Sequence, residues 1–336
     1  MVFDPTAPIF VTGGSGLIGS FLISHLLREG HRVRAVYRGQ EPSVPFPERV
    51  EWVKGDLLDV PFLRKALQGV QYVFHCAGLV SYAPQDEDLL MQVNVEGTAN
   101  IVNSCLEAGA VKLCHVSSVA AVGRPKGIAV LNEETKWDQT GNHPAYARSK
   151  YFGELEVWRG VAEGLQAVIV NPSVVLGPAD WNRSSTQLFK YVAGEKIFYP
   201  KGSANFVDVR DVVEAMVKLT FSDIAGERFI LNQGSCSYKA FFDQVAHCLQ
   251  KKAPYVQAPP ALTEIIWRVE HVRSWVTGKR PLITKETARL AGPGHTFRNE
   301  KLKDVIGFTF RPLEETIRWT CEKLQERQMK VEPVHQ

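Results

Sequence analysis

The first half of the chain alternates short apolar runs, rich in β-branched residues, with longer segments whose apolar residues recur at helical spacing. This alternation is typical of parallel strands that are joined by crossover helices. It predicts a doubly wound parallel α/β sheet. The expected strands cover residues 9–11, 33–37, 50–54, 72–75, 111–116 and 167–170, and the expected helices cover 17–28, 86–108 and 145–162.

The pattern changes after residue 172, where loops lengthen, strand-like runs become scarce and helical stretches dominate. We therefore expect a sheet domain over 1–172, with elements that return to it near 203–232. A smaller, mostly helical C-terminal lobe is expected over 173–202 and 233–330. The helices expected in this lobe cover 237–251, 259–276 and 312–328, and a helix that returns to the sheet domain is expected over 211–220.

The composition is that of a globular protein, because 45% of the 336 residues are hydrophobic and 22% are charged. A formal net charge of only +3 predicts no nucleic-acid partner. No apolar run approaches the roughly 20 residues that cross a bilayer, and the start of the chain lacks the pattern of a signal peptide. We expect no integral membrane segment and a cytoplasmic location. The six cysteines have no CxxC or paired-histidine spacing, which predicts reduced thiols and no metal site.

A glycine-rich segment, TGGSGLIGS over residues 12–20, follows the first expected strand and opens the first expected helix. Gly14, Gly16 and Gly19 satisfy G-x-G-x-x-G, and Gly13 adds a second glycine spacing. Such glycines permit a tight turn and let the backbone approach a pyrophosphate at a helix N-terminus. Between a strand and a helix, the segment predicts nucleotide binding rather than a turn without a ligand.

The second expected strand is followed by Arg38, where a NAD-selective site would have an acidic residue. A carboxylate there would repel the 2′-phosphate of NADP, whereas a guanidinium pairs with the phosphate and stacks on adenine. Arg38 therefore favours NADP(H) over NAD(H). The alternative is a solvated charge at the end of a strand.

Tyr146 and Lys150 lie four residues apart, on one face of an expected helix. That helix follows the strand that ends before Ser117 and Ser118, at the sheet edge where doubly wound folds bind ligands. A nearby cation favours the phenolate of a tyrosine. We expect Tyr146 to transfer a proton, Lys150 to supply the cation and Ser118 to hold the substrate oxygen. The alternative is a surface tyrosine and lysine on the first helical turn.

With these motifs the chain resembles an extended short-chain dehydrogenase/reductase, of the NAD(P)-dependent epimerase/dehydratase superfamily, over nearly its whole length. The matching segments include residues 12–20, 54–57, 75–78, 94–98, 116–118, 146–150, 171–173, 176–178 and 206–212. The resemblance implies a catalytic set of Ser118, Tyr146 and Lys150, with Ser117 as the alternative to Ser118. The expected cofactor site consists of Thr12, Gly13, Gly14, Gly16, Leu17, Ile18, Gly19, Arg38, Asp56, Leu57, Ala77, Gly78, Asn94, Ser117, Tyr146, Lys150, Pro172, Ser173 and Val175.

Departures from the family pattern narrow the reaction. Sugar-nucleotide dehydratases of this family have Thr-Asp-Glu after the strand, whereas this chain has Ser-Val-Ala over 118–120, which disfavours dehydration. The epimerases commonly have an arginine just before a Phe-Val-His-Val segment, where this chain has Asn205. A nucleotide sugar therefore lacks its usual anchor, unless Arg183 or Arg210 replaces it.

The remaining pattern resembles the branch of dihydroflavonol-4-reductases and 3β-hydroxysteroid dehydrogenases, and the segments 297–302 and 307–315 fit that branch. This implies an NADPH-dependent oxidoreductase that transfers hydride to a carbonyl, or from a secondary alcohol, of a largely apolar small molecule. The domain over 1–172 would bind NADP, and the C-terminal lobe would bind the substrate.

Two alternatives stay open for the function, namely a nucleotide-sugar epimerase and a non-catalytic NADP-sensing regulator. The family resemblance is also compatible with a homodimer, because helices such as those over 86–108 and 145–162 often pair between its subunits. The helix expected over 259–276 is interpreted as a lid, a membrane-surface contact or a packing helix.

Overall fold

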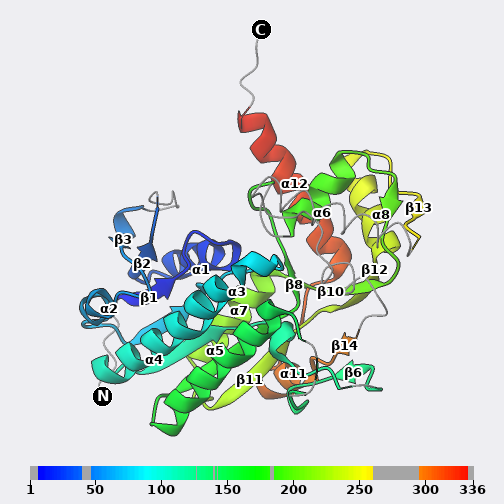
Figure 1. Ribbon diagram of the computed structural model, residues 1–336. Helices are drawn as coiled ribbons and strands as arrows, with labels where there is room; N and C mark the ends of the chain where they lie inside the picture. The colour runs from blue at the N-terminus through cyan, green and yellow to red at the C-terminus, as the bar shows by residue number, and fades with distance from the viewer. Residues whose placement is uncertain are drawn as a thin grey trace.

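The computed structural model describes residues 7–39, 47–125, 127–138, 141, 143–181, 185–259 and 295–331. A seven-stranded sheet forms its centre (Figure 1), with every neighbouring pair of strands parallel. The expected doubly wound sheet is confirmed. In spatial order its strands are β3 (Val50–Lys54), β2 (Val33–Tyr37), β1 (Ile9–Thr12), β4 (Tyr72–His75), β5 (Lys112–Val116), β7 (Ala167–Pro172) and β11 (Glu227–Leu231).

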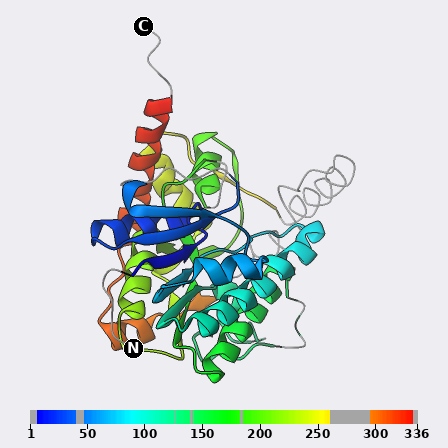
Figure 2. The ribbon, with the colours of Figure 1, turned by 90° about the vertical axis from the view of Figure 1, so that its left-hand side faces the viewer.

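Helices cover both faces of this sheet because successive strand residues point to opposite sides. Val11 packs with Leu22 on one face, whereas its neighbour Phe10 packs with Ile101 on the other. Helices α4 (Gly97–Ala108) and α5 (Ala145–Ala162) lie side by side on the face that contains Phe10 (Figure 2). The first face has α1 (Leu17–Arg28), α7 (Val209–Thr220) and α11 (Glu300–Ile306), and the second has α2 (Val60–Ala66), α4 (Gly97–Ala108) and α5 (Ala145–Ala162).

Strand order places a binding crevice at β1. Connections lead from β1 toward β2 and β3 on one side, and the later strands β4, β5 and β7 lie on the other. At such a reversal the loops after neighbouring strands separate, and a crevice opens beyond their carboxyl ends. The segments that follow β1, β4 and β5 contain most of the expected site residues.

The helix expected over 86–108 is interrupted. It consists of α3 (Glu87–Met91), a π-helical turn (Gln92–Glu96) and α4. The turn contains Asn94, which is buried. Apolar periodicity predicts that a segment is helical but not the insertion of a π-turn, a feature that is frequent at functional sites.

The C-terminal lobe contains more strand than the sequence pattern predicts. A three-stranded sheet packs against α6 (Thr186–Ala193), α8 (Tyr238–Leu249) and α12 (Leu313–Val331) around a core that includes Phe189, Phe206 and Phe241. The sheet consists of β12 (Gly234–Ser237), β10 (Ser203–Asp208) and β8 (Val174–Leu176). Two short pairs are β9 (Phe198–Tyr199) with β13 (Val256–Gln257), and β6 (Val130–Leu131) with β14 (Thr296–Phe297).

The helix expected over 259–276 lies outside the described residues apart from its first position, and Arg183 lies outside them as well. The described part of the chain contains no helix with the length and apolar character needed to cross a membrane.

Candidate active site

The glycine turn after β1 is pressed against the chain that follows β4. Gly13 has a φ of +70°, and a Cβ at this position would lie 2.6 Å from the backbone nitrogen of Ala77. A Cβ on Gly19 would lie 2.2 Å from the carbonyl oxygen of Gly13. Gly16 begins α1 without a side-chain cap, so the first N–H groups of the helix are available to an anion. The expected cofactor residues Gly14, Leu17 and Ile18 lie in the same turn.

Thr12 joins this turn to the centre of the sheet through a chain of hydrogen bonds. Its hydroxyl oxygen accepts a bond from the backbone N–H of Ala77 (3.1 Å) and lies 2.7 Å from Nδ1 of His75. Nε2 of His75 lies 3.0 Å from the hydroxyl of Thr98, which donates to the carbonyl oxygen of Asn94 (2.7 Å). Burial lowers the pKa of His75 to about 3. The ring is therefore neutral, with Nδ1 as acceptor and Nε2–H as donor.

Asn94 fixes the loop after β4. Its amide group donates to the carbonyl oxygen of Leu79 (2.9 Å) and to the hydroxyl of Ser149 (2.9 Å), and its Oδ1 accepts from the backbone N–H of Leu79 (2.7 Å). The side chain is thus saturated by protein groups. In this structure its role is to hold the loop against α5.

Lys150 projects from α5 between the carboxyl ends of β4 and β5. Its Nζ donates to the carbonyl oxygen of Val116 (2.9 Å), and a Cβ on Gly78 would lie 3.0 Å from it. Burial lowers the pKa of Lys150 to about 8, and the charge of Glu154 opposes this shift. Lys150 therefore retains a substantial protonated fraction at neutral pH.

Tyr146 lies one helical turn before Lys150, and its phenol interacts with the side chain of Ser118. Burial and the neighbouring Tyr82 raise the pKa of Tyr146, and the interaction with Ser118 opposes them. The expected lowering by Lys150 is not seen, because desolvation of the phenol is the dominant effect. Tyr146 is therefore a protonated donor in this structure.

Of the two candidate serines, Ser118 faces Tyr146. Its Oγ also accepts from the backbone N–H of Ala120 (3.2 Å), which fixes the start of the short helix at Val119–Ala121. Ser117 is buried, and its hydroxyl has no hydrogen-bond partner among the described residues. The geometry thus favours Ser118 as the partner of Tyr146.

Glu154 is a buried carboxylate that the motif analysis missed. The side-chain amide of Asn171 donates both to Glu154 and to the carbonyl oxygen of Ser118 (2.9 Å), and Nη1 of Arg228 lies 3.4 Å from Oε2. Burial raises the pKa of Glu154, and its polar neighbours, which include Asn171 and Arg228, oppose the shift. Its position, one turn after Lys150 on the same helix face, is the sequence signal that would have found it.

Beyond the carboxyl ends of β2 and β3, Arg38 lies beside Asp56. Its Nη1 is 3.7 Å from Oδ2 of Asp56, and both side chains are exposed. Asp56 also accepts a bond from the backbone N–H of Leu58 (3.0 Å). Leu57 is buried against Gly97. These three expected cofactor residues therefore lie together at the ends of β2 and β3.

The remaining expected residues follow β7. Pro172 ends this strand, and the backbone N–H of Ser173 donates to the carbonyl oxygen of Leu231 (2.9 Å). The hydroxyl of Ser173 is buried and has no hydrogen-bond partner among the described residues. Val175 lies in β8 opposite Val207.

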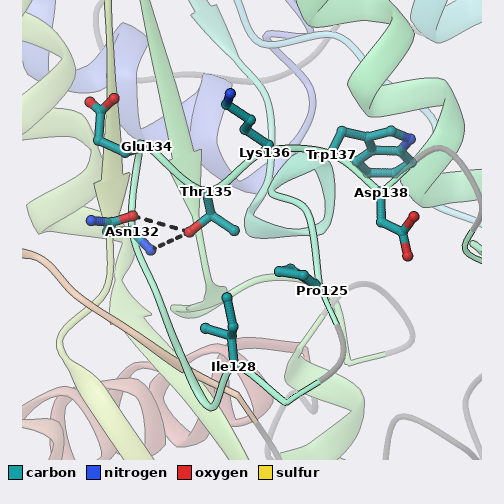
Figure 3. A pocket seen from close by; sticks show the side chains of 8 residues that line it. All are labelled: Pro125, Ile128, Asn132, Glu134, Thr135, Lys136, Trp137 and Asp138. Atoms are coloured by element: carbon teal, nitrogen blue, oxygen red, sulfur yellow. Dashed lines mark hydrogen bonds between the residues drawn. The ribbon is translucent and has the colours of Figure 1, made fainter.

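A separate pocket of about 450 Å³ lies beside the loop that connects β6 to α5 (Figure 3). Asn132 and Thr135 are joined there by two hydrogen bonds of 3.0 Å. None of the three expected catalytic residues contributes to its wall. The lining residues are Pro125, Ile128, Asn132, Glu134, Thr135, Lys136, Trp137 and Asp138.

The glycine turn, the uncapped helix and the Ser118–Tyr146–Lys150 arrangement on a parallel sheet define a class, the extended short-chain dehydrogenase/reductases. The model of the NAD dependent epimerase/dehydratase family matches residues 9–230. The chain belongs to that family, and it is an NAD(P)-dependent oxidoreductase that acts on a small molecule.

Similar proteins agree with this assignment. The chain is 32% identical to sterol demethylase protein B of Methylococcus capsulatus, over 88% of this chain and 92% of the relative. It is 28% identical to cinnamoyl-CoA reductase 1 of Petunia hybrida, over 95% and 92%. The crystal structure of gox2253 matches with a TM-score of 0.81 and 30% identity, over 96% of this chain and 98% of that one.

Proposed function

We propose that the protein is an NADPH-dependent reductase of a carbonyl group on a largely apolar small molecule, and that it catalyses the reverse oxidation of the corresponding alcohol. The observation that carries the proposal is the placement of Tyr146 beside Ser118 at the carboxyl edge of the sheet, one helical turn before Lys150, whose Nζ donates to the carbonyl oxygen of Val116 (2.9 Å). The lobe over 173–202 and 233–330 would select the substrate.

The residues of the chain account for the proton in this reaction. Ser118 and Tyr146 donate hydrogen bonds to the carbonyl oxygen and polarise it. NADPH held at the glycine turn and Arg38 would supply the hydride that the carbonyl carbon accepts. As negative charge develops on the oxygen, Tyr146 transfers its proton there. The ammonium group of Lys150 then stabilises the phenolate that remains.

Two features of the structure suit a dinucleotide. The glycine turn leaves no room for side chains between the backbone segments at Gly13 and Ala77, and α1 presents its open N-terminus at the same place. Among the described residues, the one ion pair of the exposed Arg38 guanidinium is a 3.7 Å contact to Asp56, so it remains able to pair with a 2′-phosphate. This supports NADPH over NADH.

The structure offers no diphosphate anchor at Arg210. Its guanidinium lies 2.6 Å from Asp208 and 3.3 Å from Glu315, and it stacks 4.0 Å above the ring of Trp319. An arginine held in this way does not favour the epimerase alternative. The sensor alternative is disfavoured by the complete Ser118–Tyr146–Lys150 set.

The test is oxidation of NADPH by the protein with a panel of aldehydes and ketones, compared with Tyr146→Phe. Loss of the proton donor should reduce kcat at least a hundredfold. Tyr151→Phe is the matched control, because Tyr151 lies on the same helix and stacks on Trp137 (4.3 Å) instead. Activity that survives in Tyr146→Phe, or no oxidation with any carbonyl, would reject the proposal.

A further inference from the structure

Ser118 is the first residue beyond the hydrogen-bond ladder that joins β5 to β7. Among the described residues, the last backbone bond between these two segments runs from the N–H of Ser117 to the carbonyl oxygen of Val170 (2.8 Å). Ser118 then begins a short helical turn, where its Oγ accepts from the backbone N–H of Ala120 (3.2 Å) and its carbonyl oxygen accepts from that of Ala121 (3.0 Å). These two bonds are local, so they shape the turn but do not attach it to the sheet.

The side chain of Asn171 attaches this turn to the sheet. Its amide nitrogen donates to the carbonyl oxygen of Ser118 (2.9 Å) and to the carboxylate of Glu154. Asn171 is fully buried in β7, and because these two acceptors use both amide hydrogens, the orientation of the amide group is determined. Among the described residues, Asn171 is the one side chain that donates to the backbone of Ser118.

Glu154 and Arg228 fix Asn171 from its other side. Oε2 of Glu154 lies 3.4 Å from Nη1 of Arg228. Arg228 in turn donates from Nε to the carbonyl oxygen of Glu133 (2.8 Å) and from Nη2 to that of Thr135 (3.2 Å). Glu154 is buried, and a buried ion pair adds little net stability, because desolvation offsets the attraction. It does give Asn171 an acceptor with a fixed position.

We propose that Asn171 is a positioning residue for the reaction, and that it holds Ser118 at the edge of the sheet so that the serine hydroxyl meets the substrate oxygen beside Tyr146. The inference rests on the proposed reductase function, which gives Ser118 its role. A hydrogen-bond donor in a catalytic site has to stay within about 0.5 Å of its productive position. A serine on a turn without this bond would move relative to α5, which contains Tyr146.

The test is a double-mutant cycle of Asn171→Ala and Ser118→Ala. NADPH oxidation is measured with the aldehyde or ketone that the wild-type protein reduces fastest. Asn171→Ala alone should lower kcat about tenfold or more and change KM for NADPH less than about twofold. In the Ser118→Ala protein the same substitution should lower kcat less than about twofold, because the hydroxyl that Asn171 positions is already absent.

Asn232→Ala is the matched control for the loss of a buried amide. Asn232 directly follows the neighbouring strand β11, is as deeply buried as Asn171, and donates to the carbonyl oxygen of Phe297 (2.9 Å). In both asparagines Oδ1 has no hydrogen-bond partner among the described residues. Asn232→Ala should lower the midpoint of a thermal melt about as much as Asn171→Ala does, but kcat should stay within about twofold of the wild-type value.

A crystal structure of Asn171→Ala gives a second readout that does not need turnover. Oγ of Ser118 should be displaced by more than about 0.5 Å relative to Tyr146. If Asn171→Ala does not fold, Asn171→Ser, which keeps one donor, replaces it in both measurements.

Two results would each overturn the role of Asn171. One is an undisplaced Ser118, and the other is a loss of kcat by the same factor with and without the serine hydroxyl, as a purely structural effect would give. The reductase proposal is judged separately, by the wild-type protein alone. If the wild type oxidises no NADPH with any carbonyl, the reductase is rejected and with it the catalytic purpose of the bond to Ser118, whereas wild-type turnover with an undisplaced Ser118 rejects only the role of Asn171.

Discussion

Arg38 determines the choice of cofactor in our proposal, so Arg38→Ala should change that choice. Loss of charge-assisted bonds to a 2′-phosphate should raise KM for NADPH about tenfold or more, while KM for NADH changes little. Steady-state kinetics with both cofactors measure the effect. Arg34→Ala, in the strand β2 that precedes Arg38, is the control, because Arg34 is paired with Glu51 (2.8 Å). Equal losses with both cofactors would contradict the assignment.

Alanine substitutions at Gly13 and Gly30 distinguish the effect of backbone strain on stability from the effect of a close contact. Both glycines have positive φ values, +70° and +87°, but no atom of the described part of the chain lies within 4 Å of a Cβ on Gly30. Gly30→Ala should therefore lower the free energy of unfolding by about 1 kcal/mol through backbone strain alone. Gly13→Ala should lower it by about 3 kcal/mol or more, because its Cβ meets the backbone of Ala77. Urea unfolding of both variants measures the difference, and similar losses would show that the close approach is unimportant.

At the scale of single residues, the sequence predicts those site residues whose spacing along the chain follows a regular helix or turn. Tyr146 and Lys150 share a helix face, and the glycines mark a turn with a known steric requirement. Tyr82, whose ring packs against Tyr146, comes from a loop, where no periodicity relates one position to another. The direction of the pKa shift of Tyr146 was also beyond the sequence, because it depends on burial by the tertiary fold.

Helix α5 connects the proton donor, the ammonium group and a buried carboxylate at successive turns. Glu154 raises the pKa of Lys150, which burial otherwise lowers to about 8. Glu154→Gln removes this charge, so the pKa of Lys150 should fall. Because catalysis requires the protonated amine, the alkaline limb of the kcat profile should move to lower pH by about one unit.

The pH profile distinguishes this electrostatic effect from a general loss of structure, which would lower kcat without moving the limb. Glu156→Gln is the control, since Glu156 lies on the same helix but pairs with Arg159 (2.9 Å) at a partly exposed site. A limb at the wild-type pH in Glu154→Gln would show that Glu154 holds Asn171 and Arg228 without affecting Lys150.

The bounds of a helix or strand could be predicted from the sequence where all residues of the element lie in the same kind of environment. Strands β2, β3 and β4 and helices α1 and α5 match their expected bounds, because strands of a covered parallel sheet are apolar runs and their helices are amphipathic. Strands β8 and β12 were missed because they are short and partly exposed. Helix α2 was missed as well, and its seven residues are too few to display a period.

At the scale of the whole molecule, two histidines lie buried in the centre of the seven-stranded sheet. His75 and His115 lie on neighbouring strands with ring centroids 5.2 Å apart. Both nitrogens of His115 have no hydrogen-bond partner among the described residues. Burial lowers the pKa of both rings, that of His75 to about 3. The native protein therefore contains two neutral imidazoles over most of the acidic range.

The lowered pKa values of these buried histidines make the free energy of unfolding depend on pH. Below the ordinary histidine pKa of about 6.5 the unfolded chain binds a proton at His75 that the native state does not bind until about pH 3. Stability is therefore lost as the pH falls through this window. Between pH 7 and 5 the loss from His75 should be about 2 kcal/mol, so His75→Gln should reduce the pH dependence of the unfolding free energy by that amount. Urea unfolding at both pH values measures it, with the exposed His247→Gln as control. An unchanged difference in His75→Gln would mean that other groups determine acid stability.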